Sequence, residues 1–119
     1  MTERENIFLN NIYKILETNE DTSVNILARN MDISKSTLNR KLKFITGLSP
    51  NQLIREYRMK KATALLLEGY NVTQTAYKTG FNSGSYFIQC FKRFYKMTPK
   101  EYIKKNVFLQ NRTDVSNLS

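Results

Sequence analysis

The sequence predicts an all-α fold of about seven helices, in which two similar helical units are joined by a long central helix. Three observations predict this fold. Apolar residues recur at intervals of three and four through most of the chain, which is the period of an α-helix. Helix-capping residues precede these stretches, and glycines follow several of them. The layout of residues 33–53 also returns, at a fixed offset of 49, between residues 80 and 102.

The first subdomain is expected to comprise residues 1–48 and to hold three helices. Each helix begins at a side-chain oxygen that can accept a hydrogen bond from the first turn; in order these are Thr2 with Glu5 at capping-box spacing, Thr22 or Ser23, and Ser34. Leu38, Leu42 and Ile45 share the apolar side of the third helix. Gly47 ends it, because glycine adopts the left-handed conformation without Cβ strain.

The linking helix is expected to comprise residues 49–69. Ser49 is its cap, Pro50 occupies the first helical position and Gln52 the third, and Gly69 ends it. At 1.5 Å per residue such a helix is about 27 Å long. It separates the two similar units.

The second subdomain is expected to comprise residues 70–107. Its three helices begin at Asn71 with Gln74, at Ser83, and at Thr98 followed by Pro99. Phe87, Phe91 and Phe94 are predicted to form the buried side of the second of these helices. Residues 108–119 are polar and aperiodic, and are expected to be a disordered tail.

Composition restricts the class of protein. The 119 residues suffice for one compact region or two very small ones. With 19 Lys and Arg against 10 Asp and Glu, the net charge is +9, which indicates attraction to nucleic acid or an anionic membrane surface. The alternative is that this charge only keeps the protein soluble.

Residue types needed for catalysis and metal binding are scarce. The chain has no histidine, and Cys90 is its single cysteine, so neither an internal disulfide nor a multi-thiolate zinc site is expected. No catalytic residue, metal or cofactor is therefore predicted. No apolar run is long enough to span a bilayer, and the polar start is unlike a signal peptide. A cytoplasmic protein without a membrane partner is expected.

Each of the two similar units has a short capped helix, a tight turn and a second short helix with a polar outer side, which is the layout of a helix-turn-helix motif. The second helix of such a motif can enter the major groove of DNA. The residues predicted to read bases are Ser36, Asn39 and Arg40 in the first unit, and Gly84, Ser85, Tyr86 and Gln89 in the second. Arg40 suits guanine, whereas Asn39 and Gln89 suit adenine.

Other residues at these two helices suit phosphate groups: Lys35, Lys43, Lys92 and Arg93, and the helix starts at Ser34 and Ser83. For any single helix, a polar side is more often a solvated surface than a binding site. Arg40 could also pair internally with Glu56 or Glu68, and an internal ion pair is the favoured role for Arg58. The duplication, in a chain of charge +9, favours DNA binding.

The same residues resemble a known family. Residues 34–50 read S-x-x-x-L-x-R-x-L-K-x-x-x-G-x-S-P, and Gly80-Phe81, Ser85-Tyr86-Phe87 and Thr98-Pro99 follow in the second unit. This pattern is similar to the AraC/XylS family of bacterial transcription regulators, over about residues 7–104. The resemblance implies a transcription activator whose two recognition helices enter successive major grooves of double-stranded DNA. It also implies the base-reading positions named above, RNA polymerase as a partner of the full regulator, and a monomeric isolated domain.

Three residues depart from the family pattern. Gln89 stands where arginine is frequent, which favours adenine over guanine there. Lys96 replaces a glycine at a predicted left-handed position, and Thr75 replaces a branched aliphatic residue. The opening stretch IFLNNIYKILETN is similar to the segment that precedes this domain in response regulators and hybrid sensor kinases, so an output domain of a two-component system is expected.

Three other classes of protein could account for a basic helical chain. An enzyme with an appended DNA reader would need a zinc-held cysteine cluster, and one cysteine without histidine argues against it. A second alternative is an architectural DNA binder without base preference. A membrane-surface protein is disfavoured, because the basic residues lie on short capped helices rather than on one amphipathic strip. The favoured interpretation is a sequence-specific DNA-binding domain.

Overall fold

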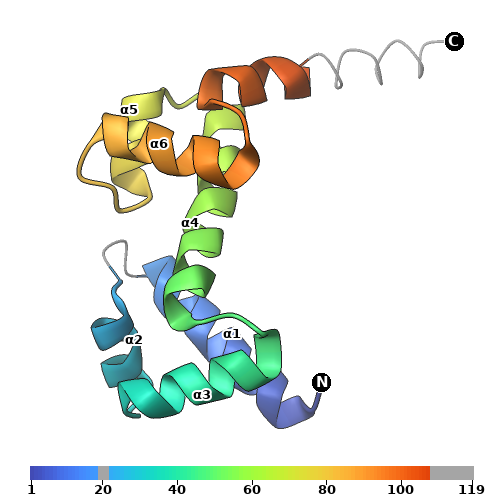
Figure 1. The fold of residues 1–119 in the computed structure, drawn as a ribbon, viewed down its shortest axis with the longest axis vertical. Helices are drawn as coiled ribbons and strands as arrows, with labels where there is room; N and C mark the ends of the chain where they lie inside the picture. The colour runs from blue at the N-terminus through green and yellow to red at the C-terminus, as the bar shows by residue number, and fades with distance from the viewer. Residues whose placement is uncertain (19–21, 108–119) are drawn as a thin grey trace, which may run out of the picture. The chain divides into compact units, whose positions relative to one another are not determined.

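The computed structural model describes residues 1–18 and 22–107, and every regular element in these ranges is a helix. The elements are α1 (Glu3–Thr18), α2 (Val24–Asn30), α3 (Lys35–Thr46), α4 (Pro50–Leu67), α5 (Val72–Lys78) and α6 (Gly84–Tyr95), and residues 99–107 are also helical (Figure 1). The all-α prediction is confirmed. The predicted tail, 108–119, lies outside the described residues. Within the described ranges, no helix is both long and apolar enough to cross a membrane.

The helix starts follow from side-chain caps. Ser23, not Thr22, caps α2 by accepting from the backbone N–H of Ile26 at 3.3 Å. Thr22 is buried, and its carbonyl accepts a hydrogen bond of 2.8 Å from Arg58, for which the sequence had suggested an ion pair. At α5 both bonds of the capping box between Asn71 and Gln74 are present.

The helix over residues 99–107 has a reciprocal start of the same kind. The Glu101 backbone N–H donates to Thr98 Oγ1 at 3.1 Å, and the Thr98 backbone N–H donates to Glu101 Oε1 at 3.2 Å. Hydrogen bonding from Thr98, first from its backbone N–H and then from its side chain, stabilises the charged carboxylate and holds the pKa of Glu101 below its usual value. Thr98 and Glu101 therefore act together as the predicted helix start.

The chain divides into two compact units, Met1–Lys60 and Lys61–Ser119, with the boundary inside α4. The core of the first unit is aliphatic and draws on α1, α2, α3 and the start of α4. Its buried members are Ile12, Leu16, Leu27, Ala28, Leu38, Leu42, Leu53 and Ile54. Tyr13 and Tyr57 pack at its edge, with ring centres 6.1 Å apart. Burial, followed by the nearby charge of Glu17, raises the pKa of Tyr57.

The core of the second unit is aromatic. Phe87 and Phe91 are fully buried, with ring centres 5.8 Å apart. The Phe91 ring also lies 4.8 Å from Tyr95 and 5.7 Å from Tyr102. The prediction that Phe94 belongs to the buried side of this helix is wrong, because Phe94 is 40% exposed. Packing against Tyr102 selects the side of α6 that carries Phe87, Phe91 and Tyr95, each four residues apart.

Thr75 leaves a polar atom without a partner in this core. Its side chain is fully buried, and its Oγ1 has no hydrogen-bond partner within the part of the chain that the structure describes. Thr79, which is also buried and lies one turn further along, instead donates from Oγ1 to the Thr75 carbonyl at 2.7 Å. A buried hydroxyl without a partner costs about 1–3 kcal/mol. Threonine at position 75, in place of the branched aliphatic residue of the family pattern, therefore lowers the free energy of unfolding.

We expect Thr75→Val to raise the free energy of unfolding by about 1 kcal/mol, because valine keeps the shape and removes the unpaired hydroxyl. Urea unfolding followed by circular dichroism measures the change. The control is Thr79→Val, which removes a hydroxyl that is hydrogen-bonded and should not stabilise. Equal stabilisation by both variants would show that the unpaired hydroxyl is not the cause.

Lys96 occupies a backbone conformation that favours glycine. It ends α6 at φ 62° and ψ 21°, close to the φ 78° and ψ 0° of Gly47 at the end of α3. The predicted left-handed position of Lys96 is thus confirmed. An L-residue pays about 1–2 kcal/mol for this conformation, and glycine does not.

Lys96→Gly is expected to stabilise the chain by about 0.5–1 kcal/mol, since part of the relieved strain is offset by the greater freedom of glycine in the unfolded chain. Thermal unfolding measures the effect. Lys96→Ala removes the same charge but keeps the Cβ, so it should give no such gain. If alanine stabilised as much as glycine, loss of charge would be the explanation.

Candidate nucleic-acid interface

The exposed side of α3 carries the residues predicted to read bases in the first unit. These residues, Ser36, Asn39 and Arg40, are exposed, as is Lys43, which was predicted to contact phosphate. They stand at i, i+3, i+4 and i+7, so they project from one side of the helix. Leu38 and Leu42, fully buried, hold the opposite side against the core. The structure therefore brings these four polar side chains together.

The start of α3 offers backbone donors next to this side. The Ser34 hydroxyl accepts from the Thr37 backbone N–H at 3.1 Å, and the Leu38 N–H donates to the Ser34 carbonyl at 3.0 Å. Helix geometry leaves the N–H groups of Lys35 and Ser36 without an acceptor in the helix. Donors at a helix start attract phosphate oxygens.

The second unit presents a similar surface on α6. Ser85, Gln89, Lys92 and Arg93 are exposed, and Ser83 caps the helix by accepting from the Tyr86 N–H at 3.1 Å. Tyr86 is 56% exposed, and its ring lies 5.8 Å from Phe81. All the residues predicted for this surface lie in the first three turns of α6 or at its cap.

Gly84 is half-buried at the start of α6. A Cβ built on it would meet no atom closer than Thr73 Oγ1, at 4.0 Å, which is ordinary van der Waals contact. Its φ does not lie in the left-handed region. Nothing within this unit therefore requires glycine at this position.

The two surfaces share the same frame but differ in side-chain chemistry at several positions. The caps Ser34 and Ser83, and the residues that end the two helices, Gly47 and Lys96, each differ by the predicted offset of 49. At this offset Lys43 corresponds to Lys92, but Arg40 corresponds to Gln89. The first surface therefore offers a charged guanidinium where the second offers a neutral amide.

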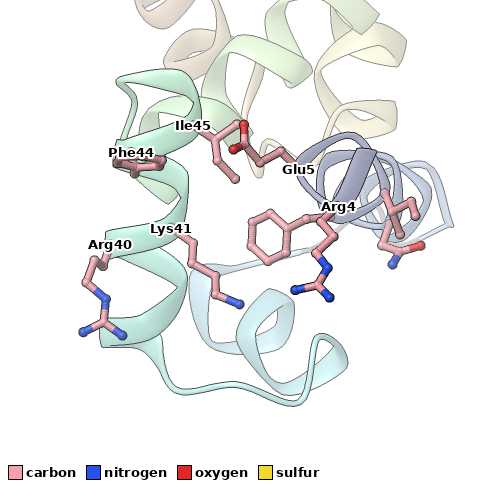
Figure 2. A pocket seen from close by; sticks show the side chains of 9 residues that line it. Arg4, Glu5, Arg40, Lys41, Phe44 and Ile45 are labelled. Carbon is pink, nitrogen blue, oxygen red and sulfur yellow. The ribbon is translucent and has the colours of Figure 1, made fainter. Parts of the chain in front are cut away.

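Arg40 has no ion-pair partner among residues 1–18 and 22–107. Glu56, one of the two carboxylates suggested for it, instead pairs with Lys60 at 3.2 Å. The guanidinium of Arg40 is exposed and points away from the first-unit core in Figure 2. It is therefore available to an external acceptor.

A pocket of about 590 Å³ lies between α1 and α3, beside the first surface (Figure 2). Sequence reasoning assigned no role to its lining residues Lys41 and Phe44. The repeat does show that these two positions differ between the units, because at the offset of 49 they correspond to Cys90 and Arg93. In the described ranges, no cluster of His, Cys, Asp or Glu side chains is arranged to hold a metal ion.

Residues 27–105 match the family described as a helix-turn-helix domain. The chain is 36% identical over 98 residues to Histidine kinase P4 of Formosa agariphila, covering 79% of this chain and 7% of that protein. It is also 36% identical over 104 residues to the HTH-type transcriptional regulator AdiY of Escherichia coli strain K12, covering 85% and 41%. The chain thus spans less than half of the length of either relative.

Two solved structures have the same fold. One is the C-terminal domain of the two-component response regulator yesN from Fusobacterium nucleatum, with TM-score 0.75 and 28% identity, covering 86% of this chain and 99% of that one. The other is the DNA-binding domain of AdpA in complex with a target DNA, with TM-score 0.72 and 27% identity, covering 82% and 89%.

Proposed function

Since this chain belongs to the AraC-type family of helix-turn-helix transcription regulators, we propose that it binds double-stranded DNA sequence-specifically as the output domain of a bacterial regulator. The observation that carries the proposal is the pair of exposed polar surfaces on α3 and α6, capped in the same frame in a chain of charge +9. The AdpA domain, which has this fold, forms a complex with a target DNA. Binding, without a chemical step, is the activity.

Base reading is assigned to Ser36, Asn39 and Arg40 on α3 and to Gly84, Ser85, Tyr86 and Gln89 on α6. In the major groove, Arg40 would donate to guanine O6 and N7, while Asn39 and Gln89 would bridge N6 and N7 of adenine. The amide of Gln89 both donates and accepts, as adenine recognition requires. The two units therefore read different bases at equivalent positions.

Phosphate contacts are assigned to Lys35, Lys43, Lys92 and Arg93 and to the helix starts after Ser34 and Ser83. These contacts supply affinity and set the register of each helix on the duplex. Gly84, which is assigned to the base-reading set, has no side chain, and its own unit does not require glycine there. A backbone without a Cβ can approach the DNA closely.

The proposed division is a first reading subdomain over 1–48, a linking helix over 49–69 and a second reading subdomain over 70–107. Two such subdomains would enter successive major grooves, whose centres are about 34 Å or ten base pairs apart. The 18-residue α4 belongs partly to each compact unit.

In a longer regulator, this domain would act in the cytoplasm and contact RNA polymerase as part of activation. A role as the output domain of a two-component system is supported by one relative that is named a histidine kinase and by one structural neighbour that is the C-terminal domain of a response regulator. The domain by itself is proposed to be monomeric and to need no cofactor.

Selection of bound duplexes from a random pool at moderate salt tests the proposal. We expect a split consensus, with the centres of its two halves about ten base pairs apart. Binding of the pool without any consensus would favour an architectural DNA binder instead. No binding to duplex DNA would contradict both.

A further inference from the structure

We propose that the pocket between α1 and α3 binds a small organic anion that has a flat apolar body and one carboxylate. The lining residues are Arg4, Glu5, Ile7, Phe8, Asn11, Arg40, Lys41, Phe44 and Ile45. At about 590 Å³ the pocket is within the size range of small-molecule sites. This inference does not depend on the proposed DNA-binding function.

Two cations face each other in this pocket. Figure 2 shows the side chain of Lys41, from α3, and that of Arg4, from α1, pointing toward one another. Neither has a carboxylate within ion-pair distance in the part of the chain that the structure describes. Glu5, the acidic lining residue, lies toward Ile45 rather than between the two cations. A ligand carboxylate placed between Lys41 and Arg4 would accept charge-assisted hydrogen bonds from both side chains.

The remaining lining suits an apolar body. Lys41 Nζ lies 5.4 Å from the centre of the Phe8 ring, so the cation sits directly over an aromatic surface. Ile7 is 53% exposed and Phe44 is 83% exposed, so both side chains present apolar surface to an incoming ligand. Apolar surface beside unpaired cations is complementary to an amphipathic anion.

The helix-turn-helix scaffold does not itself require these residues. At the offset of 49, the second unit has Cys90 in place of Lys41 and Arg93 in place of Phe44. It nevertheless forms a helix of the same 12-residue length, with a serine cap at its start and a left-handed residue at its end. Lys41 and Phe44 are therefore specific to the first unit, and a ligand explains their presence.

Titration of the 119-residue chain with sodium 2-naphthoate, followed by amide chemical shifts in NMR, tests the proposal. We expect saturable shifts confined to residues 4–11 and 40–45, with a dissociation constant in the millimolar range or tighter. The neutral analogue 2-naphthamide should bind at least about fivefold more weakly, because it lacks the charge. Equal binding of the two, or shifts spread over both units, would overturn the proposal.

Variants distinguish naphthoate binding in this pocket from non-specific attraction of an anion to a basic protein. Lys41→Gln should weaken naphthoate binding about tenfold, and Phe44→Ala should also weaken it. Lys43→Gln is the matched control, because Lys43 is an exposed lysine of the same helix that does not line the pocket. Equal losses in the two lysine variants would contradict a defined site.

A protein partner is the competing occupant. If an acidic amphipathic peptide shifted the pocket amides and naphthoate did not, the groove would be a protein-docking surface and the small-molecule assignment would be wrong. Amide spectra of each variant without ligand establish that it is folded.

Discussion

Arg40→Ala is expected to weaken binding to the selected DNA site by about 1–3 kcal/mol, or about 5- to 150-fold, and to relax the preference at one base pair. The reason is that Arg40 is exposed, has no internal ion-pair partner among the described residues and lies beside Asn39 on the polar side of α3. A guanidinium can donate two parallel hydrogen bonds to guanine O6 and N7. Competition binding against duplexes changed at single base pairs measures both effects.

Arg40→Lys separates charge from geometry. Lysine keeps the positive charge but lacks the planar fork, so we expect binding to random DNA to persist and the base preference to be lost. Lys43→Ala provides the phosphate control on the same helix. It should weaken binding to all sequences alike and reduce the slope of log K against log salt by about one. If Arg40→Ala lost affinity equally for specific and random DNA, its proposed role in base reading would be wrong.

Phe91→Ala is expected to lower the free energy of unfolding by about 3–5 kcal/mol. Phe91 is fully buried, and its ring contacts Phe87, Tyr95 and Tyr102 at centre distances between 4.8 and 5.8 Å. Removing it leaves a cavity at the centre of the aromatic core of the second unit. Urea unfolding, followed by circular dichroism and by amide exchange in α6, measures the loss.

Phe94→Ala is the matched control, since it makes the same substitution on the next turn of the same helix. Phe94 is 40% exposed, and its ring contact is with Tyr95, its neighbour in sequence. We expect a loss of less than about 1 kcal/mol, as for a partly exposed aromatic residue. Similar losses for Phe91→Ala and Phe94→Ala would mean that α6 packs on a different side.

The helix boundaries of this chain were predictable because the start and end of a helix depend on residues close in sequence. The Ser49 N–H donates to Gln52 Oε1 at 2.9 Å, and the Gln52 N–H donates to Ser49 Oγ at 3.2 Å, as the spacing indicated. The left-handed end at Gly47 was predicted from its place after the helix, and the one at Lys96 from the glycine that the family pattern has at that position. Such contacts join residues no more than four positions apart, so they can be predicted from the spacing of residues in the sequence.

The polar sides of the two reading helices were predictable for the same reason. Once Leu38 and Leu42 are assigned to the core, the helical period places Ser36, Asn39 and Arg40 outside. Likewise, once Phe87 and Phe91 are assigned to the core, the helical period places Ser85 and Gln89 on the exposed side of α6. The structure finds all of these polar residues exposed.

The sequence by itself determined the helices, their caps, the duplication and the sign of the charge, because each follows from short-range spacing or from composition. Only the tertiary structure decided which of several equally spaced side chains are buried. It placed Tyr95 rather than Phe94 against Tyr102, and it joined Arg58 to the carbonyl of Thr22, 36 positions away. It also brought Arg4 of α1 toward Lys41 of α3. These contacts depend on how distant segments pack, and the period of a single helix does not contain that information.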